Sequence, residues 1–250
     1  MKISAVIITK NEERNIGRCL EGLQEVADEV IVVDTFSEDR TQEICESYGA
    51  RFITKEWLGY SATKNFANDL AQFPYILSLD ADEALSDELR SSILEVKERL
   101  EGVYSFNRLA IYCGKPIRRA GWYPDRKIRL FPKEGAKWEG PYVHEELVPN
   151  PGQKETWLKG DLLHYTYYTI DEHRERARKY AKLAAEKLKS KGKGTLFLKG
   201  VFSPVWRFLQ MYFIRLGFLE GWRGYRISMI TAKEVAWKYW GAFSRSQSKQ

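Results

Sequence analysis

Apolar and amphipathic segments alternate regularly over the first hundred residues. Ile3–Thr9 and Glu29–Asp34 are β-branched runs bounded by polar residues, which is typical of buried strands. Apolar residues recur at near-helical spacing over 15–27 between them. The alternation continues with expected helices at 41–48 and 61–70 and expected strands at 51–54 and 75–79. This order predicts a parallel sheet with helices on both faces.

The pattern changes after an expected helix at 87–100. Strands are expected at 103–109, 127–132 and 156–164, separated by loops rich in Gly, Pro, Trp and Tyr, so this part is expected to be mixed or antiparallel. An amphipathic helix follows at 171–189, with Thr169 or Asp171 as its cap and His173 on its surface. The run at 189–194 is the best linker candidate. The fold class is therefore α/β, with a mixed, mainly parallel sheet flanked by helices and a C-terminal helical extension.

Composition narrows the class of protein. A chain of 250 residues, 44% of them hydrophobic, can bury a sizeable core. Its three cysteines are too few and too scattered for a disulfide framework or a zinc knuckle, which fits a reducing compartment. The N-terminal apolar run is too short for a signal peptide, and no stretch reaches the roughly 18 to 20 apolar residues that cross a bilayer. We therefore expect a cytoplasmic protein that rests on a membrane rather than spanning it.

Charge is unevenly distributed. Residues 171–250 carry 18 Lys and Arg against 6 Asp and Glu, whereas residues 1–170 carry 22 against 28. An acidic body with a basic tail favours an anionic partner for the tail, although well-solvated helices explain the same charge.

Polar clusters follow three of the expected strands, at 9–13, 34–37 and 80–83. In open parallel sheets, ligands gather beyond the carboxyl ends of the strands. In an extended turn Asp80 and Asp82 point the same way, so both carboxylates can approach one hard cation; a solvated or helix-capping acidic turn is the alternative. The chain has neither Gly-X-Gly-X-X-Gly after its first strand nor a Walker-type loop, which argues against a nicotinamide enzyme and an NTPase.

Six motifs carry a family resemblance. They are Ile-Ile-Thr-Lys-Asn-Glu-Glu (7–13), Val-Ile-Val-Val-Asp-Thr-Phe-Ser-Glu-Asp-Arg-Thr (30–41), Ala-Thr-Lys-Asn (62–65), Leu-Asp-Ala-Asp-Glu (79–83), Gly-Trp-Tyr-Pro-Asp-Arg-Lys-Ile-Arg-Leu-Phe (121–131) and Val-His-Glu-Glu-Leu (143–147). Together they resemble the family 2 glycosyltransferases of GT-A fold and, more narrowly, the bacterial branch that adds sugars to the lipopolysaccharide core. The resemblance implies a catalytic domain at 1–170, with a nucleotide-sugar half at about 1–100 and an acceptor half at about 101–170. Residues 171–250 are then a basic, aromatic-rich helical extension.

The resemblance implies a donor site. Asn11 and Glu12 are expected beside the nucleotide and Lys64 near the diphosphate. Asp34 is expected to accept a hydrogen bond from the base, most often the uracil of a UDP-sugar; the alternative is a cap for the following turn. The neighbouring Thr9, Asp80 and Ala81 complete the set of expected nucleotide-sugar-binding residues.

The family's chemistry needs a metal ion and a base. Asp82 is expected to be the principal ligand of Mn²⁺ or Mg²⁺, with Asp80 nearer the ribose or the metal and His164 as an extra ligand. His164 ends an expected strand, where a structural role is the alternative. Family 2 enzymes invert the anomeric carbon, so a carboxylate must deprotonate the acceptor hydroxyl. Glu145 is the expected base within the pair Glu145-Glu146, although the chain lacks the Glu-Asp pair that many members carry there.

Aromatic and basic residues define an expected acceptor cleft. Trp122, Tyr123 and Trp138 can stack on sugar faces, although core packing explains each of them equally well. His144 is expected to orient the base or contact the acceptor. Five basic residues can grip a phosphorylated or carboxylated acceptor: Arg118, Arg119, Arg126, Lys127 and Arg129.

The tail and the overall function remain open to alternatives. The aromatic, arginine-punctuated segment beginning at Val205 favours peripheral contact with anionic lipid at the inner face of the membrane, against packing on the catalytic domain or a homodimer. The preferred function is transfer of a sugar to a glycan or glycolipid, in lipopolysaccharide core or related envelope polysaccharide synthesis, with no nucleic acid as a partner. A metal-dependent nucleotidyltransferase and a non-enzymatic glycan- or nucleic-acid-binding module are the alternatives.

Overall fold

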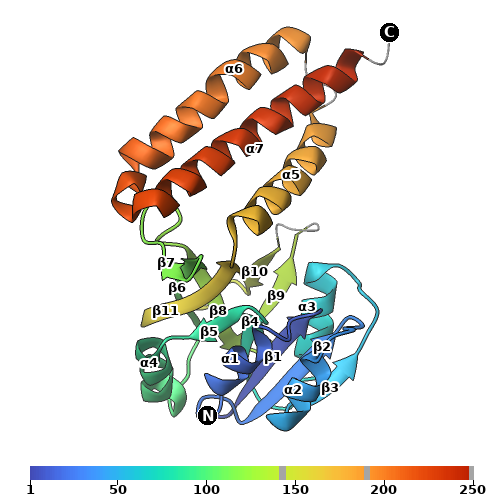
Figure 1. Cartoon of the computed structure of the whole chain (residues 1–250). Helices are drawn as coiled ribbons and strands as arrows, with labels where there is room; N and C mark the ends of the chain where they lie inside the picture. Colours follow the sequence, from blue (N-terminus) through green and yellow to red (C-terminus); the bar gives the residue numbers. More distant parts are fainter. Residues whose placement is uncertain (141–144, 189–191, 248–250) are drawn as a thin grey trace. The chain divides into compact units, whose positions relative to one another are not determined.

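The computed structural model describes residues 1–140, 145–188 and 192–247, and the chain forms two compact units (Figure 1). Unit 1 comprises Met1–Arg108 and Asp125–Tyr165, and unit 2 comprises Leu109–Pro124 and Thr166–Gln250. Residues 109–124 thus belong with the C-terminal helices. The division at residue 170 into a catalytic domain and an extension stays a prediction, because compactness alone does not test independent folding.

Unit 1 is built around a twisted mixed sheet. Its helices are α1 (Ile16–Glu21), α2 (Thr41–Ser47), α3 (Tyr60–Asp69) and α4 (Asp87–Lys97). Its strands are β1 (Ile3–Thr9), β2 (Glu29–Asp34), β3 (Arg51–Thr54), β4 (Tyr75–Asp80), β5 (Glu83–Leu85), β6 (Val103–Tyr112), β8 (Arg126–Pro132), β9 (Ala136–Glu139), β10 (Glu146–Pro149) and β11 (Glu155–Tyr167); β6 and β11 run on into unit 2. The main sheet has the order β3-β2-β1-β4-β8-β6-β11-β5, and β9 pairs separately with β10. The pairs among β1 to β4 are parallel, whereas β8 pairs antiparallel with β4 and β6, and β5 antiparallel with β11.

Two apolar layers enclose the parallel strands. Side chains alternate across a strand, so Ile3 and Ile7 of β1 belong to one cluster while Val6 and Ile8 belong to the other. The first cluster also holds buried residues of α1, α2 and α4, and the second holds residues of α3. Both faces of the sheet are therefore covered, which explains why these strands are almost continuously hydrophobic.

Unit 2 is mainly helical. It contains β7 (Lys115–Pro116), α5 (Ile170–Lys187), α6 (Lys193–Leu209), a π-helical turn (Gln210–Ile214), a short 3-10 helix (Gly217–Glu220) and α7 (Gly221–Gln247). The Thr169 side chain accepts the Glu172 N–H and the Glu172 carboxylate accepts the Thr169 N–H, a capping box that starts α5. Helix α7 packs against both α5 and α6. No helix in the described ranges is long and apolar enough to cross a membrane.

The structure confirms the predicted fold class, a mixed α/β sheet with flanking helices and a C-terminal helical region. The helix expected at 15–27 is shorter, because α1 ends at Glu21 and the buried Leu23 and Val26 lie in turns. Residues 189–191 of the predicted linker lie outside the described residues, and α6 already begins at Lys193.

The expected surface position of His173 is wrong. The side chain is buried in unit 2, stacked on Tyr167 with ring centroids 4.5 Å apart, and Nδ1 lies 3.2 Å from the Tyr112 hydroxyl. Burial, followed by the charge of Arg176, lowers its pKa from 6.5 to about 4. His173 is therefore a neutral core residue at pH 7.

Candidate active site

Three polar clusters meet at one edge of the parallel sheet. In the register of β1 with its neighbours, Thr9 lies opposite Asp34 of β2 and Ile8 lies opposite Asp80 of β4. The carboxyl ends of these three strands therefore bring together segments that are far apart in the sequence.

Hydrogen bonds join the loops that follow β1 and β2. The Asn11 N–H donates to the Ser37 hydroxyl at 2.7 Å, and the Glu38 N–H donates to Asn11 Oδ1 at 2.8 Å. Asn11 has a φ of 53°, a left-handed conformation that asparagine tolerates better than most residues. The Glu12 N–H donates to the Thr41 hydroxyl at 2.9 Å. These hydrogen bonds hold the two loops together, and the loops form one rim of the candidate site.

Asp34 is buried at this rim and turned toward its own loop. Its carboxylate accepts the Ser37 N–H at 2.8 Å and also the Ser37 hydroxyl. This geometry is the turn cap considered as the alternative to base recognition. Nearby, the buried Thr9 hydroxyl finds no hydrogen-bond partner among residues 1–140, 145–188 and 192–247, and Ala81 is buried.

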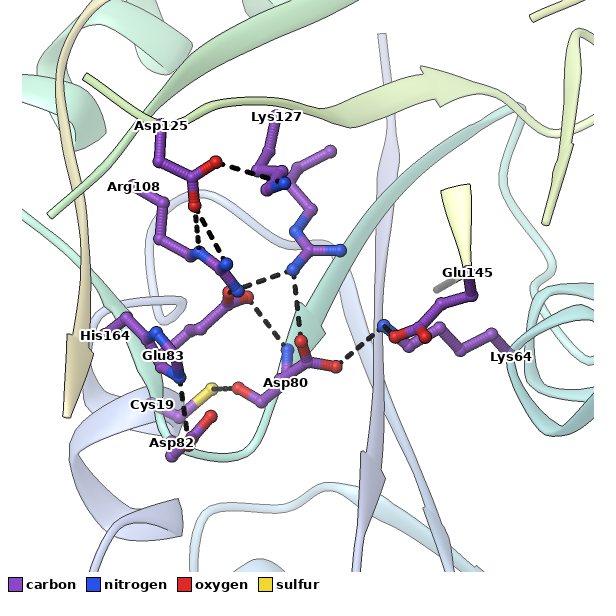
Figure 2. Close-up of polar contacts among 11 residues, drawn as sticks. Cys19, Lys64, Asp80, Asp82, Glu83, Arg108, Asp125, Lys127, Glu145 and His164 are labelled. Carbon is purple, nitrogen blue, oxygen red and sulfur yellow. Dashed lines mark hydrogen bonds and ion pairs between the residues drawn. The ribbon is translucent and has the colours of Figure 1, made fainter. Parts of the chain in front are cut away.

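Asp80 lies between two cations (Figure 2). Lys64 Nζ of α3 is 2.8 Å from Asp80 Oδ1, and Arg129 Nη2 of β8 is 3.1 Å from Asp80 Oδ2. Burial alone would raise the pKa of the Asp80 carboxyl, but Lys64 and Arg129 outweigh burial and hold that pKa well below its usual range. Asp80 is therefore a permanently ionised group with both oxygens engaged.

Glu83, to which the sequence analysis assigns no role, ties the acidic turn together. Its side chain is fully buried, and its Oε2 accepts the Asp80 N–H at 3.0 Å. Its Oε1 accepts Arg129 Nη2 at 2.9 Å, so Glu83 holds both the backbone of Asp80 and the cation that pairs with its carboxylate. The two carboxylates outweigh the effect of burial and raise the pKa of Arg129. In the sequence, only its place in the Asp-Ala-Asp-Glu run pointed to a role for Glu83. Its burial was not expected, because a glutamate is rarely buried unless it is paired.

Two further basic residues, Arg108 and Lys127, form ion pairs next to this network. Arg108 Nη1 lies 3.5 Å from Glu83 Oε1 and Arg108 Nη2 lies 2.8 Å from Asp125 Oδ2, while Lys127 Nζ lies 3.1 Å from Asp125 Oδ1. Burial would raise the pKa of Asp125, but Arg108 and Lys127 lower it. The charges of β6 and β8 are thus largely neutralised in pairs.

Asp82 lies on the other side of the turn, beside β11. Its Oδ2 is 3.2 Å from His164 Nε2, and its backbone carbonyl accepts the Tyr165 N–H at 2.9 Å. Both side chains are partly exposed. The 3.2 Å contact is a hydrogen bond between the two side chains, which remain candidate ligands of one metal ion, whereas both Asp80 oxygens are already paired with cations.

Protein groups alone do not complete a metal site. Within the part of the chain that the structure describes, no three His, Cys, Asp or Glu side chains gather closely enough to hold an ion. Mg²⁺ is commonly held by one or two carboxylates together with substrate phosphates; Asp82 could supply one such carboxylate, and His164 could add a ring nitrogen.

A cavity of about 350 Å³ opens next to Asp80. It is lined by Asp80, Arg108, Arg126, Lys127, Ile128, Arg129, Trp138, Glu145, Glu146 and Leu147. Glu145 Oε1 lies 3.6 Å from Lys64 Nζ, so Lys64 stands between Asp80 and the predicted base. The cavity therefore contains both glutamates of the Val-His-Glu-Glu-Leu motif, with Glu146 the more exposed.

Trp138 forms one wall of this cavity. Lys64 Nζ lies 4.2 Å and Arg129 Cζ 5.4 Å from the centre of its ring system. Asn65 fixes the backbone of Trp138 by accepting its N–H and donating to its carbonyl, each at 2.9 Å. The Ala-Thr-Lys-Asn motif thus supplies the cation Lys64 and, through Asn65, holds Trp138 in the cavity wall. The sequence analysis did not predict this role for Asn65.

The predicted acceptor residues fall in different units. Arg126 and Trp138 line the cavity of unit 1, whereas Trp122 and Tyr123 belong to unit 2. Trp122 packs edge-on against Tyr112 at 5.7 Å between ring centroids, and Tyr123 lies under the Arg118 guanidinium at 5.1 Å. His144 lies outside the described residues.

The chain is similar to known proteins over most of its length. Residues 4–155 match the model of the family described as glycosyl transferase family 2. An uncharacterized glycosyltransferase of Rickettsia typhi is 34% identical over 242 residues, covering 92% of this chain and 83% of that protein. The lipopolysaccharide core biosynthesis glycosyltransferase LpsC of Rhizobium meliloti is 30% identical over 252 residues, covering 94% and 92%.

Solved structures resemble the chain more distantly. Residues 1–349 of Staphylococcus aureus TarS, crystallised with UDP, are 16% identical with a TM-score of 0.45, covering 100% of this chain and 92% of that chain. The sequence matches, by contrast, extend over most of the chain. The chain belongs to the family 2 glycosyltransferases.

Proposed function

We propose that the protein is an inverting, metal-dependent glycosyltransferase that moves a sugar from a nucleotide diphosphate sugar, UDP-linked by preference, to a glycan or glycolipid. The observation that carries the proposal is the pairing of two sites at one sheet edge. Asp82 with His164 lies on one side of the acidic turn, and the cavity containing Glu145 lies next to Asp80.

Asp82 and His164 would hold Mn²⁺ or Mg²⁺ together with the donor diphosphate. The ion supplies positive charge against the negative charge that develops on the leaving nucleotide. Asp80 keeps Lys64 in place, so that a lysine ammonium remains near the diphosphate. Asn11, Glu12 and Thr9 border the nucleotide, with Asp34 bracing the rim or meeting the base.

Glu145 would act as the base. The acceptor hydroxyl oxygen forms a bond to the anomeric carbon while its proton passes to the Glu145 carboxylate, and the bond to the nucleotide diphosphate breaks with its electron pair. Lys64 Nζ lies 3.6 Å from Glu145 Oε1, so the two side chains form an ion pair beside Asp80. Glu146 is more exposed, which supports the choice of Glu145.

The acceptor would enter the cavity against Trp138, with Arg126 and Lys127 at its margin. The similarity to LpsC over most of both chains supports an acceptor in lipopolysaccharide core or related envelope polysaccharide synthesis. A lipid-linked acceptor would place the enzyme in the cytoplasm, at the inner face of the membrane, with the basic extension in peripheral contact. A homodimer through the same extension is the competing arrangement, and we propose no nucleic-acid partner.

Calorimetric titration of UDP, GDP and ADP, each with and without Mn²⁺, tests this function in the full chain. We expect Mn²⁺-dependent binding of UDP that is lost in Asp82→Asn, followed by release of UDP from a UDP-sugar. Asp87→Asn, an exposed carboxylate at the start of α4, is the matched control and should bind as the unaltered chain does. Absence of binding and hydrolysis of every nucleotide sugar in the presence of Mn²⁺ would refute the proposal, and selective GDP or ADP binding would refute the uridine assignment.

A further inference from the structure

Helix α6 exposes a continuous stripe of large apolar side chains. Leu198, Phe202, Val205, Trp206 and Leu209 recur at spacings of three and four residues, which places them on one side of the helix. We call these five residues the α6 apolar face. Their exposed fractions range from 40% for Leu209 to 67% for Phe202. Contiguous exposed apolar surface of this kind is uncommon on soluble proteins unless it binds something.

The α6 apolar face is separate from the side of α6 that packs within unit 2. Leu196 is buried with Ala185 and Ala242, residues of α5 and α7. Gly200 approaches α7 so closely that a Cβ there would lie 3.2 Å from Trp240 Cε2. The helix thus has one apolar side that the fold uses and a second that the fold leaves exposed.

Charge indicates what covers this second side. From 193 to 219 the sequence contains four basic residues, Lys193, Lys199, Arg207 and Arg215, and no Asp or Glu. The next acid, Glu220, accepts the Arg118 N–H at 3.0 Å. Large exposed apolar side chains in a segment of net positive charge match the headgroup region of an anionic bilayer, where long basic side chains reach the phosphates. A second copy would bring the same four charges against one another in a symmetric pair.

We propose that the α6 apolar face inserts into the interface of an anionic bilayer, with α6 lying along the membrane surface rather than crossing it. Trp206 and Phe202 enter the headgroup region, and the basic residues contact lipid phosphates. The inference rests on the proposed function in one respect, that the acceptor is lipid-linked, and it names the element that makes the membrane contact.

Flotation of the full chain with lipid vesicles tests the inference. We expect binding to vesicles of phosphatidylcholine with phosphatidylglycerol and much weaker binding to phosphatidylcholine alone. Phe202→Gln with Trp206→Gln should weaken the partition coefficient roughly 100-fold, because two large apolar groups no longer insert. Lys199→Gln should weaken it about fivefold, and only for the anionic vesicles.

The matched control lies on another helix of the same unit. Tyr180 and Leu183 are exposed on α5, and their double change to Gln should leave the partition coefficient within about twofold. Circular dichroism and the unfolding midpoint verify that each variant is folded. Equal flotation of the Phe202/Trp206 variant and the unaltered chain overturns the inference, as does absence of flotation. A dimer that this variant dissociates, without any vesicle binding, identifies a second copy as the occupant instead.

UDP release separates this inference from the proposed function. The Phe202/Trp206 variant should release UDP from a UDP-sugar in water at the rate of the unaltered chain, because neither residue lines the cavity. If the unaltered chain releases UDP from a UDP-sugar but does not bind vesicles, only the membrane inference is wrong. Vesicle binding without any nucleotide-sugar activity defeats only the proposed function.

Discussion

The two units depart from ordinary protein architecture in opposite ways. Unit 1 buries charge: Lys64, Glu83 and Arg129 are almost wholly enclosed around Asp80. Unit 2 exposes apolar surface, with Phe202 and Ile214 more than half accessible. Burying ions costs solvation free energy, and exposing apolar groups forgoes the hydrophobic effect. Each departure therefore marks a place where stability alone does not explain the sequence.

The same difference indicates what kind of partner each unit can bind. The buried charges of unit 1 are paired and hydrogen-bonded in fixed geometry, which suits the positioning of a reacting group. The apolar side chains of α6 form a stripe without a closed pocket, which suits a fluid, extended partner.

Removing the charge of Asp82 should have the largest effect. Asp82→Asn should lower the rate of sugar transfer about 1000-fold, because charge stabilisation by a bound metal contributes several kcal/mol to the transition state. Steady-state UDP release over a series of Mn²⁺ concentrations measures it. A variant that keeps the normal rate and Mn²⁺ dependence would show that Asp82 does not bind the metal ion. Unit 1 would then lack the catalytic role that distinguishes it here from unit 2.

Changing the two cavity glutamates one at a time should separate them. Glu145→Gln should lower kcat by roughly 100-fold or more with little change in the donor KM, because proton transfer to a positioned base contributes at that level. Glu146→Gln is the matched control and should stay close to the unaltered enzyme. The reverse ranking would assign the base to Glu146.

Neutralising Glu83 should weaken the fold as well as the reaction. Glu83→Gln should lower the free energy of unfolding by about 3 kcal/mol, because Arg129 loses a fully buried partner. Glu155→Gln breaks the more exposed pair with Arg126 and should cost less than about 1 kcal/mol. Urea denaturation of both variants compares the two, and equal costs would contradict the view that the network around Asp80 is rigidly held.

Acid should selectively weaken unit 2 through His173. Its pKa is about 4 in the folded protein and 6.5 without burial, so the unfolded chain binds the proton more readily between these values. Stability should therefore fall as the pH drops below 6.5, by about 2 kcal/mol at pH 5 from this group alone. Urea denaturation at pH 7 and pH 5 measures the loss, and His173→Gln should reduce its pH dependence. An unchanged dependence in the variant would show that His173 is not the group responsible.

Local pattern was sufficient for most elements of unit 1. The strands at 3–9, 29–34 and 51–54 match the expected bounds, because β-branched runs between polar residues specify buried strands without distant information. The sequence left the cap of α5 between Thr169 and Asp171, and the structure shows Thr169 in a capping box with Glu172. The helix expected to extend to residue 27 was wrong at its end, since buried residues in turns keep apolar spacing without helical backbone.

The sequence was enough to show which strands end in acidic turns and which residue types gather there. How the charges pair depends on the fold: Glu83 pairs with Arg129, 46 residues away, and Lys64 pairs with both Asp80 and Glu145. It also placed His173 inside and the α6 apolar face outside, although both lie on amphipathic segments. The physical reason is that periodicity acts within one turn or strand, whereas pairing and burial depend on which distant segments share a sheet edge or a helix face.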